Sequence, residues 1–113
     1  MSQITIRKAP GKWVVRAGGA VLAETADALE LTESPYPPVI YFPRNDIAMA
    51  FLDATAHSTQ CPEKGTASYY SIVTKSQTLE NAAWSYEDPK DDVKRIKEYL
   101  AFHPGDYVVV EQV

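Results

Sequence analysis

The sequence predicts a mainly β domain of α+β type, built as a small antiparallel sandwich or open barrel with two short helices. Three observations lead to this prediction. Apolar and polar residues alternate with a period of two over much of the chain. Glycine and proline interrupt these stretches at the short intervals that turns require. Strands mostly follow strands, which disfavours the parallel crossover units formed by alternating strands and helices.

The predicted strands of the first half include a hairpin. Its arms flank the segment "AGG" at 17–19, where glycine reaches positive φ without a steric penalty. The segment "ALELTE" alternates, which places Leu29 and Leu31 on one face. A further strand ends before Pro43. The strands expected here cover residues 4–6, 12–16, 20–25, 28–33 and 37–42.

The apolar spacing changes after residue 45. In "DIAMAFLDATA" apolar residues recur at helical spacing, and Asn45 or Asp46 can cap the free amides. This predicts a helix over 46–55. A second helix is expected over 91–100, where one stripe carries Val93, Ile96 and Leu100. The remaining strands are predicted at 67–74, 81–87 and 106–113, for roughly seven or eight strands in total.

Length and composition predict one domain over residues 1–113. The chain is 45% hydrophobic, enough for a single core, and contains no internal repeat. Its formal net charge is -4 and its basic residues are scattered, so we expect no nucleic-acid partner. No apolar run approaches the length of a membrane helix, so we expect no membrane partner either. A small-molecule ligand and a homo-oligomer stay open.

The cysteine content favours a reducing compartment. Cys61 is the single cysteine, so it cannot form an internal disulfide. The N-terminal residues lack the apolar stretch of a signal peptide. These two observations predict a cytoplasmic protein.

The fragment "STQCPEKGTASYY" contains the two candidate catalytic residues, Cys61 and Lys64. Lys64, or His57 four residues before the cysteine, could supply the positive charge that favours a thiolate. The alternative is a cysteine that fills the core and a lysine exposed on a turn. Pro62 stiffens the loop, and Gly65 permits a sharp turn that directs Lys64. We therefore expect the loop to line a pocket.

The same residues argue against a metal site. A structural zinc site requires four ligands, typically in Cys pairs, and the CxxC spacing is absent. Cys61 and His57 with a carboxylate would supply three ligands if the fold gathered them. We predict no native metal, and the sequence indicates no particular cofactor.

Six residues are candidates for ligand binding. Arg44 can hold a carboxylate or phosphate, or it can pair with Glu33. Asp46 is interpreted first as a helix cap. Tyr69 and Tyr70 point to opposite faces of one strand, so one of them can wall a cleft. The six candidates are Glu33, Tyr41, Arg44, Asp46, Tyr69 and Trp84.

Three fragments resemble a known family. "YFPRNDI", "TQCPEKGTASYYS" and "AAWSYEDP" follow one another after a Trp-containing hairpin, in the manner of the domain-of-unknown-function family 427, which is also labelled nucleotidyltransferase-like. The resemblance extends from about Trp13 to Phe102. It implies a β-rich domain similar to the β-tent folds. The zinc site of those folds does not carry over, because the paired cysteines are missing.

The residues do not support nucleotidyl transfer. That chemistry needs two carboxylates on one strand face, whereas Asp27 and Glu30 are three residues apart and face opposite sides. Two hypotheses stay open for the pocket around residues 61–65. One is a binding domain. The other is an enzyme that uses Cys61 and Lys64, assisted by Glu33, Asp46 or a tyrosine, on a small carbonyl or phosphate-bearing substrate.

Overall fold

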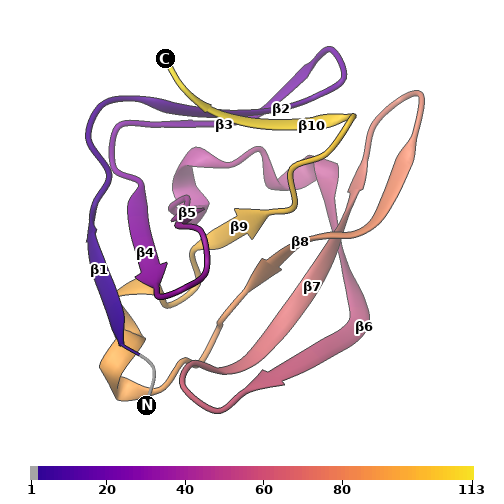
Figure 1. Ribbon diagram of the computed structural model, residues 1–113. Helices are drawn as coiled ribbons and strands as arrows, with labels where there is room; N and C mark the ends of the chain where they lie inside the picture. The colour runs from indigo at the N-terminus through magenta and orange to yellow at the C-terminus, as the bar shows by residue number, and fades with distance from the viewer. Residues whose placement is uncertain (1–2) are drawn as a thin grey trace.

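The computed structural model describes residues 3–113 and confirms the predicted class, a mainly β antiparallel protein with little helix (Figure 1). The strands are β1 (Ile4–Lys8), β2 (Trp13–Ala17), β3 (Ala20–Thr25), β4 (Leu29–Glu33), β5 (Val39–Tyr41), β6 (Leu52–Cys61), β7 (Gly65–Val73), β8 (Thr78–Ser85), β9 (Leu100–Phe102) and β10 (Val108–Gln112). The short 3-10 helices are η1 (Arg44–Asp46), η2 (Met49–Phe51) and η3 (Asp91–Ile96).

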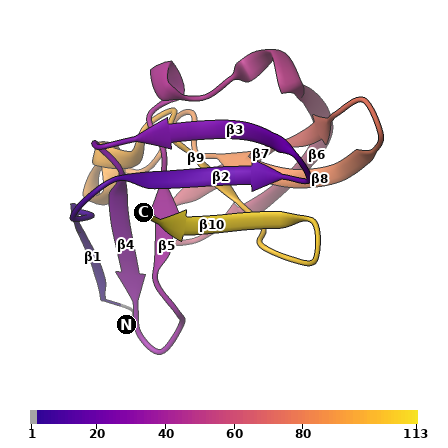
Figure 2. The same ribbon diagram turned by 90° about the horizontal axis from the view of Figure 1, so that it is seen from above.

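The strands form three open sheets, each entirely antiparallel. Their strand orders are β1-β4-β5, β10-β2-β3 and β6-β7-β8-β9. The sheet β10-β2-β3 lies across the top of Figure 1, with the other two sheets below it on the left and right. Figure 2 shows the same top sheet from above, where β2, β3 and β10 run side by side. The predicted hairpin is confirmed as β2 and β3.

One backbone contact joins two of these sheets. The amide of Phe42 donates to the carbonyl of Leu100 over 2.8 Å, and the amide of Leu100 donates back over 3.0 Å. Both residues have no exposed surface. The pair connects the end of β5 to the start of β9, and so connects the sheet β1-β4-β5 to the sheet β6-β7-β8-β9.

Two hydrophobic clusters lie on either side of this contact. The first packs the sheet β10-β2-β3 against the longer sheet and contains Val15, Leu22 and Phe42. The second packs β4 and η3 against the longer sheet and contains Leu31 and Tyr41. Because neighbouring residues of an extended chain point to opposite faces, Tyr41 and Phe42 enter different clusters.

The helix predicted over 46–55 is wrong. Two 3-10 turns and the first residues of β6 occupy this segment. The helical spacing arose because the apolar residues serve two different strands: Ile47 bridges to Ala23 of β3, whereas Leu52 pairs with Ile72 of β7. The long partner strand β7 outweighs the weak local helix propensity of the segment. The Cys61–Gly65 loop is consequently a turn between two strands.

The second predicted helix, over 91–100, is corrected to a shorter 3-10 helix. Its apolar stripe is partly right, since Val93 and Ile96 are buried in η3. Leu100, by contrast, begins β9, after Glu98 has adopted a positive φ of 65°. The sequence did not predict β9 because a three-residue strand leaves no measurable alternation.

We expect the Phe42 side chain to carry a large share of the stability. Phe42→Ala should lower the free energy of unfolding by about 3–5 kcal/mol, because it leaves a cavity at the junction of sheets. The control is Val21→Ala on β3, whose residue is 50% exposed. Denaturant unfolding measures both variants. Similar losses in the two variants would contradict the role given to Phe42, as would a Phe42→Leu variant as unstable as Phe42→Ala.

Candidate ligand-binding cleft

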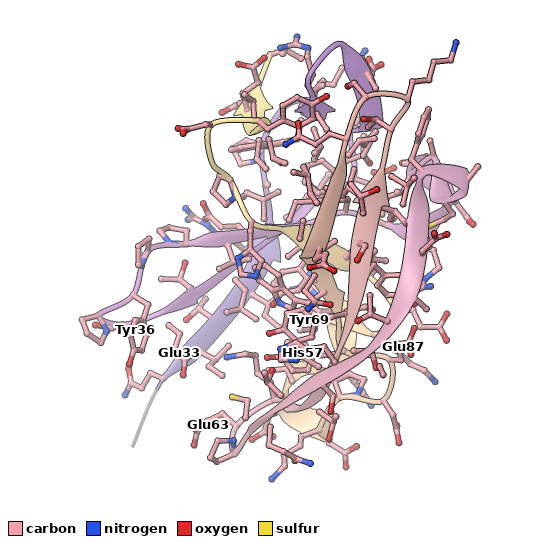
Figure 3. The ribbon with its side chains drawn as sticks, turned by 90° about the vertical axis from the view of Figure 1, so that its right-hand side faces the viewer. Glu33, Tyr36, His57, Glu63, Tyr69 and Glu87 are labelled. Carbon is pink, nitrogen blue, oxygen red and sulfur yellow. The ribbon has the colours of Figure 1, made fainter. Side chains whose placement is uncertain are left out.

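A cleft of about 240 Å³ opens between the β4–β5 hairpin and the strands β7 and β8. Figure 3 shows Glu33 and Tyr36 from the hairpin on one side, and Tyr69 from β7 on the other. The structure brings five of the predicted site residues into its lining. These are Glu33, Tyr41, Lys64, Tyr69 and Trp84.

The turn between β6 and β7 holds Lys64 in a defined position. Cys61 pairs with Gly65 across the turn, and Gly65 adopts a φ of 110°, where a side chain would be strained. The amide of Lys90 donates to the carbonyl of Lys64 over 3.0 Å, which ties the turn to the segment before η3. The conformational role predicted for Gly65 is therefore confirmed.

Lys64 and Glu33 form an ion pair at the edge of the cleft. The Nζ of Lys64 lies 2.8 Å from Oε1 of Glu33, and the two side chains are 12% and 15% exposed. Burial acts to lower the pKa of Lys64, but the hydrogen bond to Glu33 and the electrostatic influence of Tyr86 and Cys61 outweigh it. The pKa of Lys64 is therefore raised, and its amine is an ammonium at neutral pH.

Aromatic rings make up much of the cleft wall. The rings of Trp84 and His103 have centroids 4.4 Å apart, and the His103 and Tyr69 rings lie nearly parallel with centroids 6.5 Å apart. The Nε1–H of Trp84 donates to the hydroxyl of Tyr41 over 3.3 Å. Burial raises the pKa of Tyr41, and partial burial lowers that of His103 below 6.5, so both are neutral at pH 7.

Six lining residues were not among the predicted site residues, and three of these carry polar groups: Tyr36, Tyr86 and His103. Tyr36 lies in the β4–β5 hairpin and is 66% exposed. His103 directly follows β9, the strand that the sequence did not reveal. Tyr86 follows Trp84 by two residues, a spacing more typical of core than of a ligand site; it is buried in the second hydrophobic cluster and also borders the cleft.

The tyrosine pair divides between two environments. Tyr69 lines the cleft, whereas Tyr70 packs into the first hydrophobic cluster. The Tyr70 hydroxyl donates to Glu87 over 2.5 Å and accepts from Arg44 over 3.2 Å. In Figure 3 Glu87 lies on the opposite side of Tyr69 from Glu33.

Arg44 and Asp46 lie outside the cleft. Arg44 pairs with Glu87 over 3.2 Å, so the alternative in which it pairs with Glu33 is wrong; Glu33 pairs with Lys64 instead. Asp46 accepts a hydrogen bond of 2.7 Å from the hydroxyl of Thr25, and the short helix η1 has no side-chain cap. The interpretation of Asp46 as a cap is therefore wrong. Both residues join η1 to neighbouring strands.

Of the predicted loop, Lys64 lines the cleft but Cys61 does not; Cys61 is a free cysteine with a partly buried side chain. It packs against the second hydrophobic cluster. This contact agrees with the interpretation of a thiol that fills space, and a catalytic role for Cys61 stays a prediction.

Two structural features bear on other classes of function. Among residues 3–113, no group of three or more His, Cys, Asp or Glu side chains is arranged to hold a metal ion. In the same range, no helix is long and apolar enough to cross a membrane.

The comparisons with known proteins identify a family. The family described as "Domain of unknown function (DUF427)", with the short name NTP_transf_9, matches this chain over residues 5–113. This match confirms the resemblance found in the sequence fragments and extends it over almost the whole chain. No curated protein matches the chain. The likeness to β-tent folds stays a prediction.

We expect the Lys64–Glu33 pair to couple strongly. In a double-mutant cycle with Lys64→Met and Glu33→Gln, the coupling free energy should be about 1–3 kcal/mol, because each single change leaves a shielded charge without its partner. The matched control is the pair of Lys12 and Glu24, whose side chains are 53% and 54% exposed. That pair should couple by less than about 1 kcal/mol. Equal coupling free energies in the two cycles would show that shielding from solvent does not strengthen the Lys64–Glu33 pair.

The raised pKa of Lys64 predicts a dependence on alkaline pH. The pair should contribute its full stability below the ordinary lysine pKa of 10.5 and lose it as the pH rises through the higher folded-state value. The stability difference between the wild type and Lys64→Met should therefore shrink above that pH. Urea unfolding at a series of pH values measures it. Both proteins carry Tyr86→Phe in this comparison, because Lys64 acts to lower the pKa of Tyr86 and that tyrosine would otherwise ionise differently in the two. A constant stability difference would then show that the pKa of Lys64 is not raised.

Proposed function

We propose that this chain, which belongs to the DUF427 family, binds a small planar molecule whose edge carries a carbonyl next to an N–H. The proposed site is the cleft between the β4–β5 hairpin and the strands β7 and β8. The observation that carries the proposal is the Lys64–Glu33 pair, which presents a donor and an acceptor 2.8 Å apart.

The hydrogen-bonding capacity of this pair supports a neutral, amide-like ligand. An ammonium has three N–H donors and a carboxylate has two acceptor oxygens, so each group retains capacity after bonding the other. A ligand carbonyl can accept from Lys64 while the adjacent ligand N–H donates to Glu33. A free anion would gain from Lys64 but would be repelled by Glu33, since the two side chains are held together.

The cleft wall supports a flat ligand. Trp84, Tyr69 and His103 present ring faces or edges within one lining. Planar rings pack on aromatic side chains in stacked or edge-to-face arrangements. A cleft of about 240 Å³ accommodates a molecule of one or two rings.

The protonation state of Lys64 favours binding over covalent chemistry. A lysine nucleophile needs a lowered pKa, and the pKa of Lys64 is raised. The residues also offer no support for nucleotidyl transfer, because Asp27 and Glu30 lie in separate ion pairs with Lys8 and Arg7. For the location of the protein we propose the cytoplasm, where the thiol of Cys61 would stay reduced.

We expect 2-pyridone, a flat ring with adjacent carbonyl and N–H groups, to bind with a Kd on the order of millimolar, as suits so small a ligand. N-methyl-2-pyridone should bind about tenfold more weakly, because Glu33 loses its donor. Isothermal titration calorimetry or the NMR signal of the Trp84 indole N–H measures binding. Lys64→Met should weaken 2-pyridone binding by a similar factor.

The matched control is Glu24→Gln, a carboxylate change at a side chain that is 54% exposed and lies outside this cleft. It should leave 2-pyridone binding unchanged. If 2-pyridone and its N-methyl derivative bind equally, or if Lys64→Met binds as well as the wild type, the proposed recognition by the ion pair is wrong.

A further inference from the structure

A second cavity lies where the sheet β10-β2-β3 meets the sheet β1-β4-β5. Its volume is about 380 Å³, larger than that of the Lys64 cleft. Trp13 and Val110 line it from one sheet, and Ile40 lines it from the other. Trp84 and Val39 border both cavities. The proposed function of the chain makes no use of this second cavity.

One ionisable side chain, Glu30, contributes to the lining. It projects from the face of β4 opposite to Leu29 and Leu31, and its side chain is 17% exposed. The rest of the lining is apolar or aromatic and includes Phe102. A shielded carboxylate within such walls favours a ligand that combines a positive charge with an apolar body.

We propose that this cavity binds a small hydrophobic organic cation, of the aryl-alkyl ammonium class, with its ammonium group at Glu30. The aromatic lining residues Trp13, Trp84 and Phe102 suit such a ligand, because aromatic rings attract cations and pack against apolar groups. This inference rests on residues of the second cavity and is independent of the proposed function of the Lys64 cleft.

The present partner of Glu30 can be exchanged at small cost. The Nε of Arg7 donates to Glu30 over 2.7 Å, but the Arg7 side chain is 71% exposed. Ion pairs with so exposed a partner contribute little to stability. An ammonium group arriving from the cavity side replaces or supplements the guanidinium without leaving a buried charge unpaired.

The backbone at the cavity wall offers further acceptors. Among the described residues, β5 and β9 pair at Phe42 and Leu100, and their ladder does not continue. In an antiparallel ladder the next hydrogen-bonded pair would be Ile40 with Phe102. Ile40 lies two residues before Phe42, and Phe102 lies two residues after Leu100. Both of these residues line the cavity. Their carbonyls thus supply acceptors for the N–H groups of an ammonium ligand.

The two tryptophans allow a test that separates the two cavities. Both indole N–H groups are hydrogen-bonded, that of Trp13 to the carbonyl of Pro10 over 3.1 Å and that of Trp84 to Tyr41. Trp13 lines the second cavity, whereas Trp84 borders both. Their NMR signals are assigned with Trp13→Phe. A ligand in the second cavity should shift the Trp13 signal, while 2-pyridone in the Lys64 cleft should shift Trp84 alone.

The probe is 2-phenylethylammonium, compared with 2-phenylethanol and phenylacetate. The cation should shift the Trp13 signal at millimolar concentration and bind at least about fivefold more tightly than the alcohol, with phenylacetate weaker still. Glu30→Gln should abolish the preference for the cation. Arg7→Gln should strengthen cation binding by about two- to fivefold, because it removes a competitor.

The proposal is overturned if the alcohol binds the wild type as well as the cation does, or if the cation shifts Trp84 and leaves Trp13 unmoved. It is also overturned if Arg7→Gln weakens cation binding. These comparisons use the wild type and an exposed-site variant, so they hold even if Glu30→Gln impairs folding. If the second cavity does not bind the cation, the binding of 2-pyridone in the Lys64 cleft is unaffected. If 2-pyridone does not bind, the proposal for the second cavity is equally unaffected.

Discussion

The reciprocal backbone pair between Phe42 and Leu100 is the constraint on which the other parts of the structure depend. It joins the sheet β1-β4-β5 to the sheet β6-β7-β8-β9. Among the described residues these two sheets have no other strand pairing with one another. Its complete burial excludes water from the two hydrogen bonds, and unpaired backbone groups at that depth would cost several kcal/mol. The alternation of side chains through this point sends Tyr41 to one hydrophobic cluster and Phe42 to the other.

Both cavities follow from the short length of this pairing. Because β5 and β9 are joined at one position, the strand segments beyond it are not drawn together into a ladder. Tyr41 then faces the Lys64 cleft, and Ile40 faces the second cavity. Trp84 borders both spaces and is held by its hydrogen bond to Tyr41. One irregularity in pairing thereby produces two sites with different chemical character.

The charged groups divide in the same way between the two sites. In the cleft, Lys64 and Glu33 shield one another, so the site is polar but close to neutral in charge. In the second cavity, the Arg7 partner of Glu30 is largely exposed to solvent. The negative charge of the Glu30 carboxylate therefore sets the charge of the cavity lining. Arg44, by contrast, links Tyr70, Ser85 and Glu87 and holds η1 against β7 and β8, which is a structural task.

The sequence by itself determined the antiparallel β class, the first hairpin and the turn at Gly65. Those features depend on local alternation, on glycine and on residues near strand ends. Tertiary structure alone decided that residues 52–61 form a strand, that Arg44 pairs with Glu87, and that His103 joins the site. Each of these outcomes requires a partner distant in the chain, and local spacing contains no information about which partner the folded backbone will supply.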